Sequence, residues 1–286
     1  MYSRGGGKAL ARSRNVNGKC VLITGAGRGI GKRLALGFSG AGARVALLAR
    51  SKAELDLANL EIEHGGGASL RLRADVRDYE ALAAAVDRMR SQYGRTDVLI
   101  CAAGLQGPIG PFLESAPQAW LETIHTNLLG AANAVRAVLP GMIARRTGKI
   151  IFLGGRGSAD PRPNFSAYAA STAGLVRLAE TLAEELRDHN VQVNVMSPGG
   201  AYTHMIDEIL QAGERAGAKE QERAHQLRLT GGMPAEKQME LALFLASDDS
   251  NHITGKLLHV NDDWRRLEHA NVSPELYTVR RVQRTS

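Results

Sequence analysis

The chain has 286 residues, of which 44% are hydrophobic and 23% are charged, and its formal net charge is +7. This length suffices for one α/β domain with a large core or for two small domains, and the composition is typical of a globular protein. No apolar run approaches the roughly 20 residues of a membrane span, so we expect no membrane partner. Part of the positive charge lies in the two terminal segments, without interleaved aromatic residues, so we expect no nucleic-acid partner.

The first half of the chain alternates short apolar segments with amphipathic segments. Strands are expected over residues 20–24, 44–49, 68–74 and 97–101, and helices over about 29–40, 52–63 and 78–92. Ser51 is the expected N-cap of the second helix. Short apolar strands that alternate with helices indicate a mainly parallel sheet covered by helices on both faces.

The second half of the chain continues this alternation. Strands are expected over residues 149–153, 191–195 and 256–260, and helices over about 118–144, 166–188 and 235–246, with a charged helical flap over 203–230. No internal repeat appears and no linker divides the chain. We therefore expect a flexible basic arm over residues 1–17, one α/β domain over 18–263 and a C-terminal extension over 264–286.

The cysteines and histidines exclude two kinds of site. Cys20 and Cys101 fall at the ends of expected strands. This placement predicts buried, reduced thiols in a cytoplasmic protein rather than a disulfide. The eight histidines are scattered without metal-ligand spacing, so no metal site is expected.

A glycine-rich turn, Thr-Gly-Ala-Gly-Arg-Gly-Ile-Gly over residues 24–31, joins the first expected strand to the first expected helix. Glycines let the backbone turn tightly and approach a pyrophosphate, and a helix N-terminus offers free N–H groups and the positive end of a dipole. A strand, a glycine turn and a helix in this order predict a phosphate cradle for a dinucleotide.

With these elements in place, residues 18–263 resemble the short-chain dehydrogenase/reductase family. The matching motifs stand in the family's order: the turn at 24–31, Asp75-Val76, Ala102-Ala103-Gly104, Asn127, Tyr168, and Ser197-Pro198-Gly199 followed by Thr203. The resemblance implies a single Rossmann-type, doubly wound α/β domain that binds a nicotinamide dinucleotide at the carboxyl ends of its strands. It also implies a small-molecule substrate and a homodimer or homotetramer.

The resemblance assigns the cofactor contacts to the glycine turn, the strand ends and the loop after the sixth strand. The expected cofactor-binding residues are Gly25, Gly27, Arg28, Gly29, Ile30, Gly31, Arg50, Ser51, Asp75, Val76, Ala103, Gly104, Pro198, Gly199 and Thr203. Asp75 and Val76 would flank the adenine, and Thr203 the nicotinamide carboxamide. Two residues have structural alternatives: Asp75 as a helix-capping acid, and Asn127 as a polar residue that holds its helix against the sheet.

The charge at the end of the second strand bears on the choice of cofactor. A carboxylate there would accept hydrogen bonds from a ribose 2′-OH and repel a 2′-phosphate. This chain has Ala49 where the family's NAD-type acid would stand, followed by Arg50, and it has Arg28 in the glycine turn. Two guanidiniums and no acid at this corner favour NADP(H), with NAD(H) as the alternative.

The chain departs from the family at the catalytic residues. In the family an Asn, a Ser, a Tyr and a Lys carry the chemistry, and here Asn127 and Tyr168 are the two that remain. Thr172 stands where the Lys is expected, and the end of the fifth strand has Gly154-Gly155 in place of the Ser. Without a nearby cation a phenol has a pKa of about 10, so Tyr168 would donate a proton in the reductive direction as a weakened general acid.

Two side chains in the loop after the fifth strand leave alternatives open. Ser158 either takes the place of the missing Ser or is a turn residue. Arg156 either offers a cation to an anionic substrate or is solvated. The acidic and aromatic residues at 262–264 either face the substrate or pack a subunit contact, and packing is favoured.

Three functions are compatible with these features. The favoured one is an NADP(H)-dependent oxidoreductase of the carbonyl reductase or alcohol dehydrogenase type, with an incomplete catalytic set in which Tyr168 exchanges the proton. The second is a non-redox isomerase or lyase on the same scaffold. The third is a catalytically silent NADP(H)-binding subunit or sensor.

Overall fold

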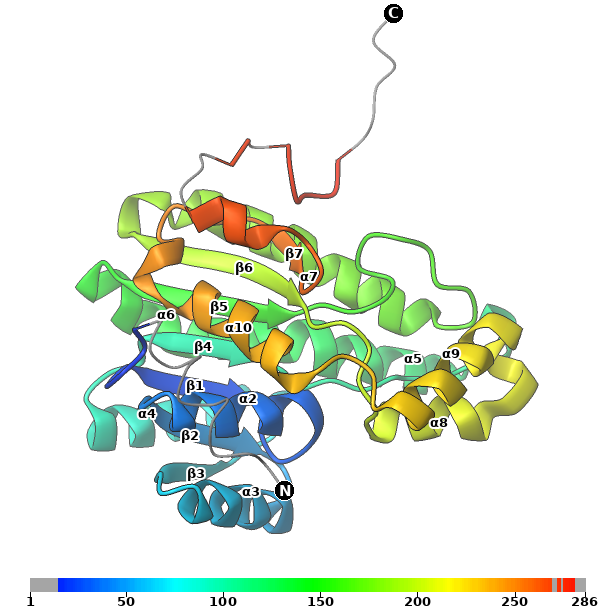
Figure 1. Cartoon of the computed structure of the whole chain (residues 1–286), viewed down its shortest axis with the longest axis horizontal. Helices are drawn as coiled ribbons and strands as arrows, with labels where there is room; N and C mark the ends of the chain where they lie inside the picture. The colour runs from blue at the N-terminus through cyan, green and yellow to red at the C-terminus, as the bar shows by residue number, and fades with distance from the viewer. Residues whose placement is uncertain (1–14, 269–271, 274, 281–286) are drawn as a thin grey trace, which may run out of the picture.

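Across the residues that the structure describes, seven parallel strands form one sheet in the order β3-β2-β1-β4-β5-β6-β7 (Figure 1). The computed structural model describes residues 15–268, 272–273 and 275–280, so most of the expected basic arm lies outside the described residues. The strands are β1 (Cys20–Thr24), β2 (Arg44–Ala49), β3 (Ser69–Arg73), β4 (Val98–Cys101), β5 (Gly148–Leu153), β6 (Val191–Ser197) and β7 (Leu257–His259).

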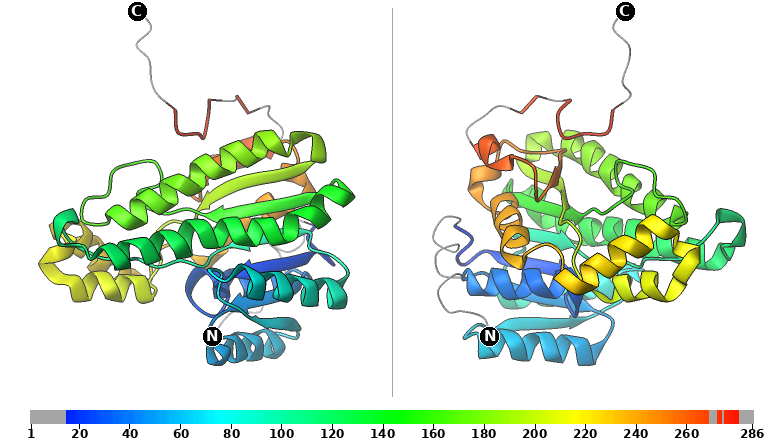
Figure 2. Two further views of the ribbon diagram at one scale, coloured as in Figure 1. Left: turned by 180° about the vertical axis from the view of Figure 1, so that it is seen from behind. Right: turned by 45° about the vertical axis from the view of Figure 1, so that its right-hand side comes forward.

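Helices cover both faces of the sheet, as the two views in Figure 2 show. One face packs against α2 (Gly29–Gly40), α3 (Lys52–His64) and α10 (Ala235–Ala246), and the other against α4 (Tyr79–Tyr93), α6 (Gly130–Arg145) and α7 (Ser166–Glu185). Three further helices, α5 (Pro117–Ile124), α8 (His204–Ala212) and α9 (Ala218–Thr230), extend beyond the sheet, and α8 and α9 lie past the carboxyl ends of the strands (Figure 1). The predicted doubly wound α/β fold is confirmed.

Alternate residues of each central strand enter different cores. Val21 and Ile23 of β1 belong to the core under α2 and α10, whereas Cys20 and Leu22 belong to the core under α4 and α6. Successive side chains of a strand point to opposite faces, so a strand buried on both faces must be apolar at every position. This explains why β1 is an uninterrupted apolar run up to Thr24, which is also buried.

The strand order fixes the position of the site. The chain builds outward from β1 through β2 to β3, then returns to place β4 on the other side of β1. The loops after β1 and β4 therefore leave in opposite directions and open a crevice at their carboxyl ends, which is where open α/β sheets bind ligands.

The predicted long helix over 118–144 is wrong in one respect. It consists of α5, a π-helical turn at His125–Leu129, and α6. The widened turn carries Asn127, whose side chain binds the loop after β4. Single π-turns inside α-helices often occur at functional sites, and hydrophobic periodicity does not reveal them.

The C-terminal residues that the structure describes pack onto the domain. Trp264 is buried and stacks on Phe244 of α10, with 5.2 Å between the ring centroids. The predicted subunit contact is therefore wrong for Trp264, because this side chain is buried within its own chain. The division of the chain at residues 17/18 and 263/264 stays a prediction.

The cysteines and the helix lengths were also the subject of predictions from the sequence. Cys20 and Cys101 are both buried free thiols. Within the described part of the chain, no helix combines the length and the apolar character needed to cross a bilayer.

Candidate active site

The predicted cofactor residues gather in one crevice of about 640 Å³ at the carboxyl ends of β1, β2 and β4. Every one of them lines this crevice except Gly199, which lines an adjoining cavity of about 550 Å³. Tyr168 lines both spaces and Asn127 lines the crevice. The residues that the sequence linked by motif order alone are therefore neighbours in space.

The glycine turn after β1 requires glycine for steric reasons. Gly25 and Gly29 have φ values of 66° and 59°, a left-handed conformation that residues with a Cβ rarely adopt. A Cβ on Gly31 would lie 2.3 Å from the carbonyl oxygen of Gly25, and one on Gly25 would lie 2.6 Å from the amide nitrogen of Ala103. The turn is thus as tight as a backbone cradle for phosphate must be.

The N-terminus of α2 is oriented to complete such a cradle. Its N-cap residue, Arg28, makes no side-chain hydrogen bond to the first turn of the helix, and that turn contains no acidic residue. The first N–H groups of the helix and the positive end of its dipole are therefore available to an anion. This arrangement fits a dinucleotide pyrophosphate.

The corner at the end of β2 holds more negative charge than the sequence indicated. Glu54 of α3 lies 3.8 Å from Arg28, and Asp75 lies 3.8 Å from Arg50. The expectation of no acid at this corner is therefore wrong, because the first turn of α3 folds back over the glycine turn and brings Glu54 to it. Both separations exceed hydrogen-bond length, and both guanidiniums are about half exposed.

The structure assigns the capping roles near this corner. Ser51 caps α3 as predicted, because its hydroxyl accepts a hydrogen bond from Glu54 N at 3.2 Å. The cap of α4 is Asp78 rather than Asp75. Although burial acts to raise the pKa of Asp75, hydrogen bonds from the side chain and backbone of Arg77 lower it overall. Asp75 is thus a carboxylate on the crevice wall, and its alternative role as a helix cap is wrong.

Tyr168 stands at the junction between the crevice and the adjoining cavity. Burial raises the pKa of its phenol, and the guanidinium of Arg162, 5.3 Å from the ring centroid, opposes the shift. The ring lies against Gly155, where an added Cβ would come within 2.4 Å of the phenol oxygen. The phenol therefore occupies the space that a side chain at position 155 would need.

The hydroxyl groups around Tyr168 are bound to backbone N–H and C=O groups. Thr172, one helical turn later, donates to the carbonyl of Tyr168 at 2.9 Å, and Ser171 donates to the same carbonyl at 2.8 Å. Ser158 donates nothing to the phenol; its hydroxyl accepts from Gly155 N at 3.0 Å, which makes it the turn residue of the two alternatives. These hydroxyls stabilise local backbone rather than the phenol.

Asn127 holds three segments together. Its amide donates to Leu105 O at 3.0 Å and to Ser171 Oγ at 3.0 Å, and its carbonyl accepts from Leu105 N at 2.7 Å. The π-turn, the loop after β4 and the helix of Tyr168 are thereby joined by a buried, fully used amide. Asn127 therefore has a structural role, because its amide joins three segments of the chain.

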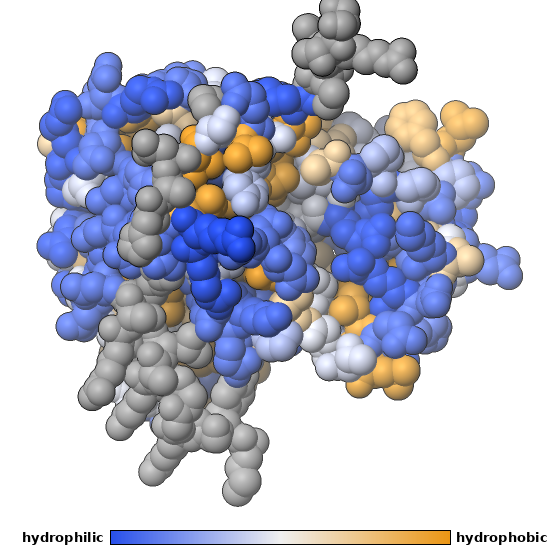
Figure 3. All heavy atoms as spheres, turned by 45° about the horizontal axis from the view of Figure 1, so that its top comes forward, coloured by the Kyte–Doolittle hydropathy of each residue, from blue (hydrophilic) through white to orange (hydrophobic). Residues whose placement is uncertain are grey.

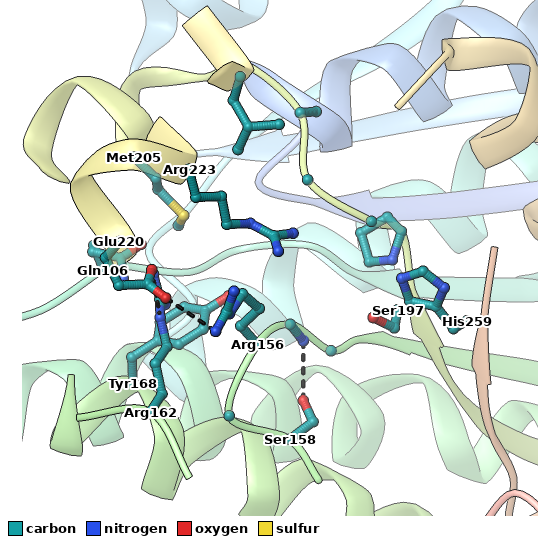
Figure 4. Close-up of a pocket in the computed structure, with 18 of the residues that line it drawn as sticks. Gln106, Arg156, Ser158, Arg162, Tyr168, Ser197, Met205, Glu220, Arg223 and His259 are labelled. Carbon is teal, nitrogen blue, oxygen red and sulfur yellow. Dashed lines mark hydrogen bonds and ion pairs between the residues drawn. The ribbon is translucent and has the colours of Figure 1, made fainter. Parts of the chain in front are cut away.

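The adjoining cavity lies between the loop after β5 and the helices α8 and α9. Figure 4 shows Arg156, Arg162 and Arg223 converging on it, with Glu220 between the first two. Arg162 donates to Glu220 at 2.8 Å, and Arg156 lies 3.2 Å from the other carboxylate oxygen. This cavity is the space next to Tyr168 in which a substrate can lie.

Comparison with known proteins identifies the family. Residues 19–213 match the model of the short chain dehydrogenase family. The chain belongs to this family. It is 36% identical over 245 residues to the oxidoreductase UcpA of Salmonella typhimurium, an alignment that covers 84% of this chain and 92% of UcpA.

Solved short-chain dehydrogenases share the fold. Actinorhodin polyketide ketoreductase, solved with NADPH, superposes with a TM-score of 0.78 at 27% identity, covering 85% of this chain and 95% of that one. Carveol dehydrogenase from Mycobacterium avium, solved with NAD, superposes with a TM-score of 0.76 at 26% identity, covering 87% and 98%. Structural neighbours of this short-chain dehydrogenase thus bind either nicotinamide dinucleotide.

Three polar residues that line the site of this short-chain dehydrogenase were not predicted from the sequence. Glu220 and Arg223 lie on α9, a helix whose weakly amphipathic sequence indicates no partner. Gln106 is buried between the two spaces, and its Nε2 has no hydrogen-bond partner among the described residues. Glu220 is 58 residues from Arg162, and no local motif indicates a pairing at that separation.

Proposed function

We propose that the protein is an NADP(H)-dependent oxidoreductase of the carbonyl reductase or alcohol dehydrogenase type. It works with an incomplete catalytic set built on Tyr168. The observation that carries this proposal is the position of the Tyr168 phenol between the glycine-lined crevice and the adjoining cavity. A carbonyl compound in the cavity would meet a hydroxyl donor and the cofactor crevice at one point. Membership of an oxidoreductase family supports the same conclusion.

A nicotinamide dinucleotide bound in the crevice would supply the hydride that reduces a carbonyl carbon. Tyr168 then provides the proton, because its raised pKa keeps the phenol protonated at neutral pH. The O–H bond of Tyr168 breaks as the carbonyl oxygen becomes a hydroxyl, and solvent restores the proton. Oxidation of an alcohol would need the phenolate, which burial disfavours, so reduction is the direction that this site favours.

The catalytic set is incomplete at two positions in this proposal. Gly155 offers no hydroxyl to polarise the carbonyl, and Thr172 offers no cation to the phenol while its own hydroxyl binds backbone. Asn127 acts by position, since it fixes the loop after β4 against the helix of Tyr168. We therefore expect slow turnover rather than the rate of a complete set.

NADP(H) is the proposed cofactor, and NAD(H) is the alternative. Arg28 and Arg50 lie at the corner where a ribose 2′-phosphate would sit, and their nearest carboxylates are too distant to bind the guanidinium N–H groups. Arginine forks suit phosphate. Because Glu54 and Asp75 partly offset the positive charge, the proposed preference for NADP(H) is moderate.

We also propose a homodimer or homotetramer in the cytoplasm. Hydrophobic side chains reach the mainly hydrophilic surface in separate groups on the face of Figure 3, and the adjacent Phe112 and Leu113 are exposed. Exposed apolar residues of this kind favour contacts between subunits. The buried free thiols support a reducing compartment.

The test of the catalytic proposal is the variant Tyr168→Phe. We expect a loss of turnover of about 100-fold or more with a panel of ketones, because a general acid contributes on this scale. The measurement is the loss of reduced nicotinamide absorbance, with NADPH affinity measured separately by calorimetry. Tyr79→Phe, at the start of α4 and away from both spaces, serves as the control.

A silent NADP(H)-binding subunit or sensor is the second candidate. The observation that favours it is the engagement of Thr172 and Ser171 with backbone, which leaves Tyr168 without an activating partner. Tight NADPH binding without turnover of any ketone would select this candidate over the reductase. An isomerase or lyase would instead convert substrate with no net change in cofactor absorbance.

A further inference from the structure

A cluster of three arginines and one glutamate surrounds the cavity beside Tyr168. Glu220 and Arg223 are three residues apart on α9 and so share a face of the helix. Arg156 and Arg162 come from the loop after β5. Glu220 Oε2 accepts two hydrogen bonds from Arg162, at 2.8 and 3.2 Å, and Glu220 Oε1 lies 3.2 Å from Arg156.

These four residues carry an uncompensated positive charge. Glu220 neutralises one of the three guanidiniums, and it is committed to Arg156 and Arg162. Arg223 has no hydrogen bond or ion pair with the described residues, and its guanidinium points into the middle of the cavity (Figure 4). Arg223 is exposed overall where it borders the open cavity. Its partial burial there and the neighbouring Arg156 and Arg162 lower its pKa, and Glu220 opposes this shift.

Two other carboxylates line the cavity without balancing this charge. Asp262 accepts a hydrogen bond from His259 N at 2.7 Å, beside β7. Asp160 is exposed on the loop after β5. Neither carboxylate is among the groups that change the pKa of Arg223. The positive charge between Arg156 and Arg223 is thus local to that end of the cavity.

A second observation also indicates an absent acceptor. Gln106 is buried on the wall that separates the cavity from the cofactor crevice, and its Nε2 donor has no partner among the described residues. Leaving a buried N–H group without an acceptor costs free energy. A ligand that brings oxygen acceptors into this cavity would offer a partner to this amide and to Arg223, which has none among the described residues.

We propose that this cavity binds the oxyanion group of the substrate, a carboxylate or a phosphate, through Arg223 and Arg156. Guanidinium groups form charge-assisted, bidentate hydrogen bonds with such oxyanions. The substrate class is therefore a carbonyl compound with an acidic group, whose carbonyl lies toward Tyr168. This assignment of the substrate rests on the proposed reductase function, whereas the anion site itself does not.

The test is a set of calorimetric binding titrations of the free, full-length protein with matched pairs of probes. The pairs are pyruvate and methyl pyruvate, levulinate and methyl levulinate, and dihydroxyacetone phosphate and dihydroxyacetone. The variant is Arg223→Met, which keeps the apolar stem and removes the charge. Arg228→Met is the control, because Arg228 is exposed on another face of α9 and lines neither space.

We expect the charged member of at least one pair to bind about 10-fold or more tightly than its neutral partner. Arg223→Met reduces this preference to about twofold or less, and Arg228→Met retains it. The pair with the largest preference shows whether the oxyanion is a carboxylate or a phosphate. Equal binding within every pair, no detectable binding of any probe, or a preference that survives Arg223→Met overturns the proposal.

Turnover separates this proposal from the proposed function. Reduction of neutral ketones by a protein that shows no preference for anions would retain the reductase and reject the anion site. A preference that depends on Arg223, in a protein that reduces none of the probes, would retain the anion site and reject the reductase.

Discussion

The two halves of the site are built in different ways. The crevice proposed for the cofactor is shaped by backbone, with Gly25 and Gly31 after β1 leaving no room for a side chain and a helix N-terminus facing the opening. The adjoining cavity is shaped by long polar side chains from α9 and from the loop after β5. A backbone cradle tolerates almost no substitution at its glycines, whereas a side-chain cluster can be retuned without changing the fold.

The two halves also differ in how they balance charge. At the cofactor corner each arginine has a carboxylate 3.8 Å away and stays about half exposed. In the cavity Arg162 and Glu220 are buried together, and Arg223 is left without a partner among the described residues. Exposed pairs contribute little to stability, but a buried pair costs much when one member is removed. The following predictions test this contrast, from the largest expected effect to the smallest.

The first prediction concerns the backbone cradle. Gly31→Ala places a Cβ 2.3 Å from the carbonyl oxygen of Gly25, which the backbone cannot accommodate without distorting the turn. We expect the affinity for NADPH to fall by about 100-fold or more, measured by calorimetry on protein whose fold is checked by circular dichroism. Gly40→Ala, at the other end of α2 with no atom within 4 Å of the new Cβ, is the control. Unchanged affinity in folded Gly31→Ala protein would show that the cradle does not bind the cofactor.

The second prediction concerns the buried pair of the cavity. Glu220→Gln removes the carboxylate that binds Arg162 and leaves that guanidinium buried without a counter-charge. We expect a loss of unfolding free energy of about 3 kcal/mol, measured by urea denaturation, with unchanged affinity for NADPH. Glu222→Gln, at an exposed position of the same helix, should change neither quantity. A parallel loss of NADPH affinity in Glu220→Gln would mean that the two halves of the site are not independent.

The third prediction concerns the pH dependence of folding stability, which we expect a buried lysine outside the site to cause. Lys149, the second residue of β5, is buried and donates a hydrogen bond to Ser250, and burial lowers its pKa to about 7. Between this pH and about 10 the unfolded chain holds the proton and the folded protein does not, so stability rises with pH across this window. Below pH 7 the lysine is protonated in both states and its burial penalty is constant.

We therefore expect the unfolding free energy of the wild type, relative to Lys149→Met, to rise by about 2 kcal/mol from pH 7 to pH 8.5. Denaturant titrations at several pH values provide the measurement. Lys237→Met, at an exposed position of α10, should follow the wild type. A flat difference between wild type and Lys149→Met would show that Lys149 keeps its proton in the folded state.

The fourth prediction concerns the exposed charges of the cofactor corner. Arg50→Gln should lower the affinity for NADPH by about fivefold and leave that for NADH unchanged, because only the 2′-phosphate would gain from this guanidinium. Parallel titrations with both dinucleotides give the ratio. Arg71→Gln, whose guanidinium binds Asp56 away from the crevice, is the matched control. Equal losses for NADPH and NADH would argue against a role of Arg50 in the choice of cofactor.

Much of the cofactor half could be predicted from the sequence. The strands and helices around it follow from apolar runs and amphipathic periodicity, and the glycine turn stands in its predicted place between β1 and α2. The cap at Ser51 could be predicted from neighbours in the chain, and the place of Thr203 on the crevice wall from motif order. These features are local, because they depend on residues a few positions apart.

The errors arose where distant residues meet. Glu54 approaches Arg28 only because α3 packs beside α2, and the π-turn at Asn127 exists in contact with Leu105. Glu220 and Arg162 can be buried because each is the other's partner, and neither residue type is normally buried without one. Each of these contacts depends on how two elements pack, and periodicity describes one element at a time.

The sequence by itself determined the doubly wound sheet, the tight glycine turn after its first strand and the place of Tyr168 at the start of its helix, because sterics and hydrophobic burial act along the chain. Only the tertiary structure decided which charges meet. It placed two carboxylates near Arg28 and Arg50 and left Arg223 without an ion pair among the described residues of the adjoining cavity. Electrostatic interactions act through space and depend on burial, so the order of residues does not encode them directly.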